Sequence, residues 1–336
     1  MRAQRRLFWF RKLALAGALL AACVVVLGAW VRLTDAGLGC PDWPGCYGHI
    51  YPIESGSYKF AKAIHEMIHR YFASTLGLII VSLLVWAVWN RKAKDQPLMA
   101  VALLFLLVCV QGALGALTVT QLLKPLIVTA HLLGGLTTLG ILWWLSMTPP
   151  PPALSAHELR LRKFALLGFA ALLVQIALGG WTSTNYAAVA CPDVPTCQGS
   201  WWPANMDFRD AFVLWRGLDI DYTGGVLANP ARVAIHVTHR LGALLAGSAL
   251  IFVGAVTFVT AGSRRLRLLG GLLVFAVLLQ IAIGVTMVRL GMPLLAATLH
   301  NAGAAFLVIC MVTLLRMLWP ANAAHMVPLQ HVHRPR

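Results

Sequence analysis

The sequence predicts an all-α membrane protein with eight transmembrane helices, arranged as two parallel four-helix repeats with pseudo-twofold symmetry. Of the 336 residues, 59% are hydrophobic and 11% are charged, and the mean hydropathy is +0.77. This composition is far from that of a water-soluble domain. Apolar stretches of about 20 residues, the length that crosses a bilayer, recur along the chain, and its two halves share motifs in the same order. These observations together predict the fold class.

The apolar stretches place the helices in order along the chain. They lie at 13–33, 66–89, 98–120, 126–147, 164–183, 232–259, 267–288 and 294–319. The consecutive prolines at 149–152 favour an extended spacer, and the loop at 201–230 has the composition of a segment with a short surface helix. We therefore divide the chain into a basic N-terminus (1–12), a first half (13–148), a linker (149–163), a second half (164–319) and a tail (320–336).

The net charge of +16 would suggest nucleic-acid binding in a soluble domain, but here the cations fall on alternate loops. This is the positive-inside pattern, and it predicts a multi-pass protein of a bacterial inner membrane with both termini in the cytoplasm. The bilayer is then the expected partner, and nucleic acid is not. The apolar run of the first span is too long for a signal peptide, so we expect the span to be retained. The basic groups are Arg2, Arg5, Arg6, Arg11 and Lys12; Arg91, Lys92 and Lys94; Arg160, Arg162 and Lys163; and Arg264, Arg265 and Arg267.

Two close cysteine pairs, Cys40 with Cys46 and Cys191 with Cys197, lie in loops expected on the outer face. That compartment is oxidising, so a disulfide bond in each loop is chemically permitted. Reduced thiols packed as small apolar groups are the alternative. The spacing of Cys40 and Cys46 does not tell whether such a bond is redox-active or structural.

The repeat is visible in the motifs that follow the first and fifth spans. An offset of 151 residues aligns Gly28 with Gly179, Trp30 with Trp181, and both CPDxPxC loops without a gap. The second loop is longer, so the offset grows to roughly 170 further on. Because each half begins and ends on the inside, the repeats are parallel and related by an axis along the membrane normal. The later matches are His69-Arg70 with His239-Arg240, Gln111 with Gln280, Gly115 with Gly284 and His131 with His300.

The four repeated histidines suggest haem iron. In each half, one histidine (His69 or His239) begins the second span and another (His131 or His300) lies about two turns into the fourth. Two imidazoles from neighbouring helices at equal depth can ligate one haem iron from both faces. A lone histidine is more often a hydrogen-bonded core residue, but four at repeated positions favour haem. The glycines one turn away, Gly134, Gly135 and Gly303, would leave room for a macrocycle.

Arginines follow two of these proposed ligands. Arg70 and Arg240 lie at the aqueous edge, where a guanidinium can hold a haem propionate through two hydrogen bonds. Arg32 and Arg289 lie at the same level. For all of them the alternative is an extended side chain that reaches lipid phosphates.

The halves differ at Glu66, one helical turn before His69. The aligned position in the second half is His236. A buried carboxylate beside only one iron site predicts one reactive site and one that relays electrons or is structural, because a carboxylate can take or pass on protons. The alternative for Glu66 is an ion pair with Arg70 at i, i+4.

The stretch from His65 to His69 also satisfies HExxH, in which two histidines bind zinc and the glutamate is a general base. A zinc protease would leave His131, His239 and His300 unexplained, and the repeat places Ile235 opposite His65. Zinc is therefore the remote alternative, and the role of His65 stays open.

The ordered motifs resemble the haem A synthase family over residues 13–319. They are GAWVRLTDAGLGCPDWPxC, the ExxHR at Glu66 to Arg70, and single histidines in the fourth, sixth and eighth spans. The resemblance implies an oxidoreductase that converts a methyl group of haem O to the formyl group of haem A, the cofactor of terminal oxidases. It also implies that Glu66, His69 and His131 serve the substrate haem, while His239 and His300 hold a permanent haem B.

Two other classes remain as rivals. One is a di-haem b-type cytochrome that only transfers electrons, against which the single Glu66 argues. The other is a transporter, which the repeat alone would favour but which gives no reason for the four histidines. A haem O synthase is the expected metabolic neighbour, whereas the electron acceptor, the source of the formyl oxygen and any homo-oligomer are left open by the sequence.

Overall fold

The computed structural model describes residues 2–51, 58–93, 96–148 and 156–319, and these ranges are helical with no β-strand. Eight of the described helices are long and apolar enough to cross a membrane, which confirms the predicted class. Two short elements, η1 (Ala187–Val189) and α6 (Phe208–Ala211), lie in the loop between α5 and α7. The long helices are α1 (Arg2–Leu33), α2 (Tyr58–Trp89), α3 (Leu98–Thr120), α4 (Pro125–Ser146), α5 (Ala156–Thr184), α7 (Asn229–Thr260), α8 (Arg264–Arg289) and α9 (Leu294–Met317).

Several helices begin earlier than the apolar stretches predicted. α1 includes the basic N-terminal residues, and α2 begins at Tyr58 rather than at residue 66. Hydropathy marks only the part of a helix that crosses hydrocarbon, whereas the backbone hydrogen bonds continue into the polar boundary. The predicted short surface helix is α6, whose N-terminal amides are capped by the Asp207 side chain. The proline spacer at 149–152 and the tail at 320–336 lie outside the described residues.

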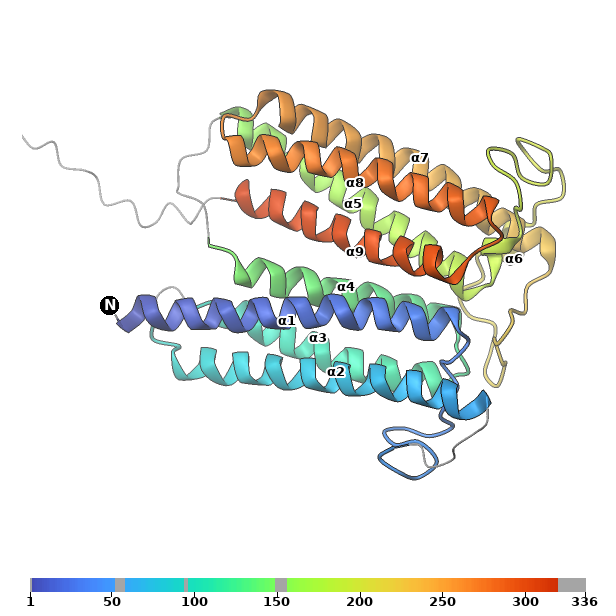
Figure 1. The fold of residues 1–336 in the computed structure, drawn as a ribbon, viewed down its shortest axis with the longest axis horizontal. Coiled ribbons are helices and arrows are strands. Elements are labelled where there is room, and N and C mark those ends of the chain that lie inside the picture. Colours follow the sequence, from blue (N-terminus) through green and yellow to red (C-terminus); the bar gives the residue numbers. More distant parts are fainter. Residues whose placement is uncertain (1, 52–57, 94–95, 149–155, 320–336) are drawn as a thin grey trace, which may run out of the picture.

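The helices pack as two neighbouring groups of four (Figure 1). In the first group α1 contacts α2 and α4, and α3 contacts the same two helices. In the second group α5 and α8 each contact α7 and α9. α1 and α4 meet α9, and α4 also meets α5, so these helices join the groups. The pseudo-twofold relation between the halves stays a prediction.

Small residues allow the two halves to approach closely. A Cβ atom added at Gly140 of α4 would lie 3.5 Å from Val312 and 3.8 Å from Val308, both on α9. On the same pair of helices, the indole of Trp143 donates a hydrogen bond to Thr313 Oγ1 at 2.8 Å. Close backbone approach at small residues and interhelical hydrogen bonds are the usual means of helix association in membranes.

The long loop between α5 and α7 crosses from the second half to the first. The amide of Tyr222 donates to the carbonyl of Leu122 at 3.1 Å, in the α3–α4 connection. Next to it, Lys124 is 1% exposed, and its ammonium donates to the carbonyl of Gly217 at 2.7 Å and lies 3.6 Å from the centre of the Trp215 ring. A buried cation is costly unless its donors are satisfied, and here a carbonyl and an aromatic face satisfy them. The loop is therefore fastened to the top of α4.

Candidate functional site

Two of the predicted histidines lie near each other within the first half. His69 on α2 and His131 on α4 are close enough for two charged imidazoles to repel each other. Each ring also lies against a glycine of a neighbouring helix: an added Cβ would be 3.0 Å from His69 Nε2 at Gly28, and 3.6 Å from His131 Cε1 at Gly115. The four helices α1 to α4 thus all contribute to one site, at the end of the bundle that carries the disulfide loops.

The second half contains the matching pair. His239 on α7 and His300 on α9 lie within the same electrostatic range of each other. An added Cβ would be 3.2 Å from His239 at Gly179 and 3.2 Å from His300 at Gly284. These glycines are the repeat partners of Gly28 and Gly115. Each of the four imidazoles therefore packs against a glycine of a neighbouring helix.

The donor set fits a haem iron better than a zinc ion. A haem needs only two protein ligands, because the porphyrin supplies the others, and each half brings two imidazoles together. A structural or catalytic zinc needs at least three protein ligands. Within the described ranges, no three His, Cys, Asp or Glu side chains converge in that way. Haem ligation by His69, His131, His239 and His300 stays a prediction, and their pairing supports it.

Two of the proposed ligands, His131 and His300, have a buried Nδ1 atom. Neither atom makes a hydrogen bond of normal geometry to the described residues. Each imidazole nevertheless lies near the backbone carbonyl of a glutamine, Gln111 for His131 and Gln280 for His300. A ligating histidine commonly directs its second ring nitrogen at such a carbonyl, which fixes the tautomer.

Glutamines at these helices were not recognised as site residues from the sequence. Gln280 donates to the backbone carbonyl of His300 at 2.8 Å, and Gln175 lies 3.0 Å from both the carbonyl and Nδ1 of His239. The sequence did contain a signal for them, because Gln175 and Gln280 are polar residues within otherwise apolar spans. Val24 occupies the position 151 residues before Gln175, so this contact has no counterpart in the first half.

The predicted role of two glycines is wrong. Gly134 and Gly303 do not leave space for a macrocycle, because an added Cβ would overlap the side chains of Gln111 and Gln280, respectively. They admit glutamines of neighbouring helices. Gly135 is different: an added Cβ there would make ordinary contact, 3.8 Å from Val25. The glycines that face the histidines are the repeated pairs Gly28 with Gly179 and Gly115 with Gly284.

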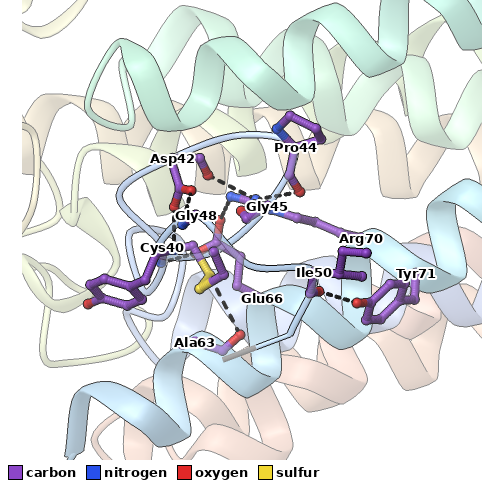
Figure 2. The surroundings of a disulfide bond; sticks show 12 residues. Cys40, Asp42, Pro44, Gly45, Gly48, Ile50, Ala63, Glu66, Arg70 and Tyr71 are labelled. Atoms are coloured by element: carbon purple, nitrogen blue, oxygen red, sulfur yellow. Dashed lines mark hydrogen bonds and ion pairs between the residues drawn. A yellow bond between two sulfur atoms is a disulfide. The ribbon is translucent and has the colours of Figure 1, made fainter. Parts of the chain in front are cut away.

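Glu66 lies one turn from His69 on the same helix and is 5% exposed. Its Oε2 accepts the backbone amide of Cys40 at 2.9 Å, and its Oε1 forms an ion pair with Arg70 (Figure 2). The intrahelical ion pair considered as an alternative is therefore formed. Arg70 is not the only partner of the carboxylate. Its other oxygen, Oε2, binds the Cys40 amide and so links the first disulfide loop to α2.

Both arginines that follow the proposed ligands hold disulfide loops. Arg70 donates to the carbonyls of Asp42, Pro44 and Gly45 at 3.0, 3.2 and 2.5 Å. Arg240 donates in the same way to the carbonyls of Thr196, Cys191 and Asp193, at 2.7, 3.1 and 2.8 Å. Sequence motifs carry no sign of such contacts, since every residue has a carbonyl. Propionate binding by these arginines stays a prediction.

The two disulfide bonds are formed as expected. Cys40 and Cys46 have Cα atoms 4.8 Å apart, and Cys191 and Cys197 have Cα atoms 4.6 Å apart. Each loop is closed by an aspartate that accepts hydrogen bonds from two backbone amides. Asp42 accepts those of Tyr47 and Gly48, and Asp193 accepts those of Gln198 and Gly199.

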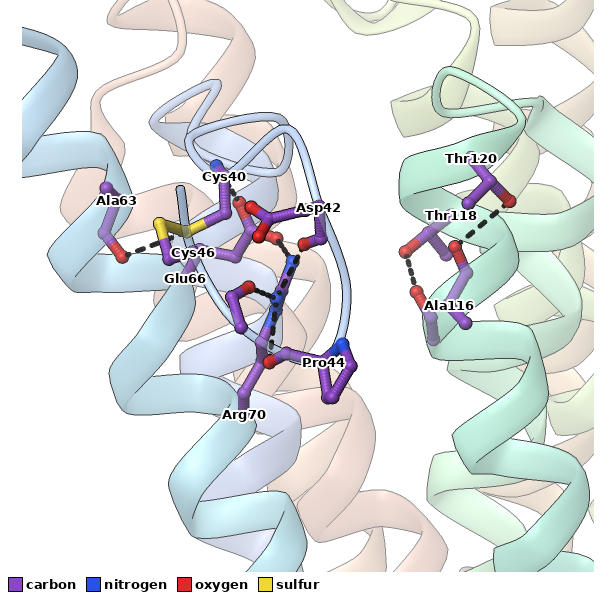
Figure 3. Close-up of polar contacts among 12 residues, drawn as sticks. Cys40, Asp42, Pro44, Cys46, Ala63, Glu66, Arg70, Ala116, Thr118 and Thr120 are labelled. Atoms are coloured by element: carbon purple, nitrogen blue, oxygen red, sulfur yellow. Dashed lines mark hydrogen bonds and ion pairs between the residues drawn. A yellow bond between two sulfur atoms is a disulfide. The ribbon is translucent and has the colours of Figure 1, made fainter. Parts of the chain in front are cut away.

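The hydroxyls of Thr118 and Thr120, at the end of α3, donate to carbonyls of their own helix and not to the first loop (Figure 3).

The remaining candidates take separate positions. His65 packs edge-on against Trp30, with ring centres 6.2 Å apart. His236 is 5% exposed and lies near the backbone of Ala187. Arg32 donates to the carbonyl of Ser183 at 2.6 Å, which joins the two halves, whereas Arg289 is exposed at the end of α8.

Comparison with known proteins gives one family model and several relatives that share the same name. Residues 11–312 match the family model COX15-CtaA, described as cytochrome oxidase assembly protein. A heme A synthase of Shewanella oneidensis is 39% identical over 335 residues, which covers 95% of this chain and 98% of that protein. Proteins of the same name from Halalkalibacterium halodurans and a Methylobacterium species are 27% and 29% identical, over 82% and 88% of this chain and 86% and 87% of theirs.

Proposed function

Because the chain belongs to the COX15-CtaA family of cytochrome oxidase assembly proteins, we propose that it synthesises haem A by oxidising a methyl group of haem O to a formyl group. Its full-length relatives carry the name heme A synthase. The enzyme is then an oxidoreductase that acts on a haem as substrate. The observation that supports this function best is the pairing of two histidines in each half, with a buried carboxylate beside only one of the pairs.

In this proposal the first half is the reactive one. His69 and His131 hold the iron of haem O, and Glu66 takes or passes on protons next to it. Bound haem supplies the iron chemistry for the methyl oxidation, and the protein supplies ligation, depth and a proton path. Arg70 keeps the Glu66 carboxylate in place and closes the site with the first disulfide loop, which limits access of water from the outer face.

The second half serves as the permanent haem B site. His239 and His300 would ligate this haem, which would supply a second redox centre next to the reactive half. The amide of Gln175 holds the backbone of the His239 turn, which suits a cofactor that stays bound. Glu66 has the imidazole of His236 as its counterpart here, so this half has no carboxylate at the position one helical turn before its proposed ligand His239.

The environment follows from the charges and from the nature of the substrate. The positive-inside pattern supports a cytoplasmic membrane with both termini inside and the disulfide loops outside. Haem O carries a long apolar chain, so it enters sideways from the bilayer, delivered by a haem O synthase. The final electron acceptor is a separate redox partner.

The decisive experiment is to express the chain with a source of haem O, extract the pigments and identify them by mass. The formyl product, or its hydroxymethyl precursor, is the expected result. A His131→Ala variant in the same host provides the matched control and should give no product. Recovery of unchanged haem O with a bis-histidine b-type spectrum would contradict the proposal and leave a di-haem electron-transfer cytochrome.

A further inference from the structure

A cavity of about 350 Å³ lies between the first turns of α1 and the last turns of α2. Its lining is Arg5, Arg6, Trp9 and Trp86. These helix ends lie at the end of the bundle opposite the disulfide loops (Figure 1). The cavity is therefore remote from all four proposed haem ligands and belongs to the boundary with the basic loops.

The lining offers positive charge and hydrogen-bond donors. Two guanidinium groups line it, and the Arg6 group is oriented by a hydrogen bond from Nη1 to Asn90 Oδ1 at 3.0 Å. The indole N–H of Trp86 is buried and has no acceptor among the described residues. The four lining residues include no carboxylate. Buried donors normally find acceptors, so this set is suited to an anion with several oxygens.

The aromatic part of the lining indicates that the ligand also has an apolar portion. Trp9 is 53% exposed and is preceded by Phe8, which is 52% exposed. Tryptophan side chains concentrate where hydrocarbon meets the headgroup region, because the ring is apolar and its N–H is polar. A small soluble anion would use the arginines but would gain nothing from these rings.

We infer that this cavity binds the headgroup of an anionic phospholipid of the cytoplasmic leaflet. The phosphodiester lies between Arg5 and Arg6 and accepts the Trp86 N–H, while the acyl chains lie against the exposed rings of Phe8 and Trp9. Arginine forms two parallel hydrogen bonds to a phosphate, and basic residues next to a membrane helix attract anionic lipids. The site is independent of haem and of the proposed oxidation.

The test uses the full chain in detergent micelles, titrated with phosphatidylglycerol or phosphatidylcholine of identical acyl chains, with bound lipids counted by native mass spectrometry. We expect one tightly held phosphatidylglycerol. Near a membrane each arginine contributes about fivefold in affinity, so the double variant Arg5→Gln, Arg6→Gln should bind about 25-fold more weakly. The matched control Arg264→Gln, Arg265→Gln removes the same charge at the start of α8 and should bind normally.

Two further variants separate lost charge from lost structure. Arg5→Lys with Arg6→Lys keeps both charges but loses the paired hydrogen bonds, so it should bind the lipid more tightly than the double glutamine variant and less tightly than the original protein. Trp86→Phe keeps a ring, loses the donor and should bind about fivefold more weakly. Equal loss of lipid in the pair at 264 and 265, or equal binding of phosphatidylcholine, would overturn the inference. Complete displacement of the lipid by millimolar inorganic phosphate would also overturn it, because the site would then serve a free anion.

Discussion

The hydroxyl of Tyr186 donates a hydrogen bond of 2.7 Å to Oδ1 of Asp35, and these residues are 151 positions apart in the chain. The same separation joins Arg32 to the carbonyl of Ser183. Since 151 is the offset that aligns the first parts of the two repeats, each bond links a residue to its own repeat partner. Contacts between repeat partners are expected only near an axis that relates the halves. The two hydrogen bonds therefore mark where the predicted axis would pass.

Removing the bond between Asp35 and Tyr186 should weaken the contact between the halves. We expect Asp35→Ala and Tyr186→Phe each to lower the free energy of unfolding by about 1 kcal/mol. The double variant should lose less than the sum of the two single effects, because both changes remove the same hydrogen bond. Denaturation in mixed micelles measures all four proteins. Fully additive losses would show that the two side chains do not interact.

Lys124 should be essential for holding the long loop between α5 and α7 against the first half. Lys124→Met keeps the stem but removes the charged donor to Gly217 and the contact with Trp215, which should cost about 2 kcal/mol. Limited proteolysis should then cut the loop at 201–228 faster. Lys163→Met, an exposed lysine at the start of α5, provides the control and should leave the loop as resistant as before. Unchanged cleavage in the Lys124 variant would contradict the assignment.

Glu66→Gln should stop turnover while haem stays bound. The amide can still accept the Cys40 amide, but it cannot take up a proton. Pigment analysis should show only haem O, and the optical spectrum should keep the bis-histidine bands. The ion pair with Arg70 is lost in this variant, so thermal unfolding is measured in parallel. Loss of bound haem from a folded protein would instead make Glu66 a structural residue.

A methyl group at Gly28 should disturb the first histidine pair. The Cβ of Gly28→Ala would lie 3.0 Å from His69 Nε2, so the ring must move. Crowding of this kind costs about 2 kcal/mol, or about 30-fold in affinity for a ligated haem. Gly77→Ala is the matched control, because an added Cβ there meets nothing within 4 Å. Haem titration followed by absorbance measures both, and equal affinities would contradict direct contact at His69.

The first disulfide loop should depend on the charge of Asp42. Hydrogen bonds from the amides of Gly48 and Tyr47 hold the pKa of this carboxyl below its usual value. The stabilisation is therefore fully present above the unfolded pKa of about 3.9 and is lost as the pH falls through the lower folded pKa. Hydrogen exchange at the Gly48 amide, corrected for intrinsic rates, should show constant protection from pH 7 to about pH 5 and a fall in strong acid. In Asp42→Asn the corrected protection should not vary with pH.

The membrane spans and the histidine pairs were predictable because both depend on residue type. Hydropathy locates a span wherever it falls, and the repeat matched His131 to His300 without any structure. The loop contacts of Arg70 and Arg240 were not predictable, because their acceptors are backbone carbonyls that any residue provides. Lys124 gave no signal either, since its partner Gly217 lies 93 residues away. Gly134 and Gly303 were assigned to the wrong neighbour, because a sequence shows where a side chain is missing but not what fills the space.

The arginine clamps on the disulfide loops have a consequence for how the protein matures. Arg70 and Arg240 stand on the helices that carry His69 and His239, and they bind the two disulfide loops. In the proposed topology these loops lie on the outer face, so their cysteines are oxidised only after they have crossed the membrane. Insertion of the helices would then precede the final positioning of both turns that carry proposed ligands. A cell that lacks thiol oxidation on the outer face would be expected to insert the chain normally yet accumulate it in an immature form.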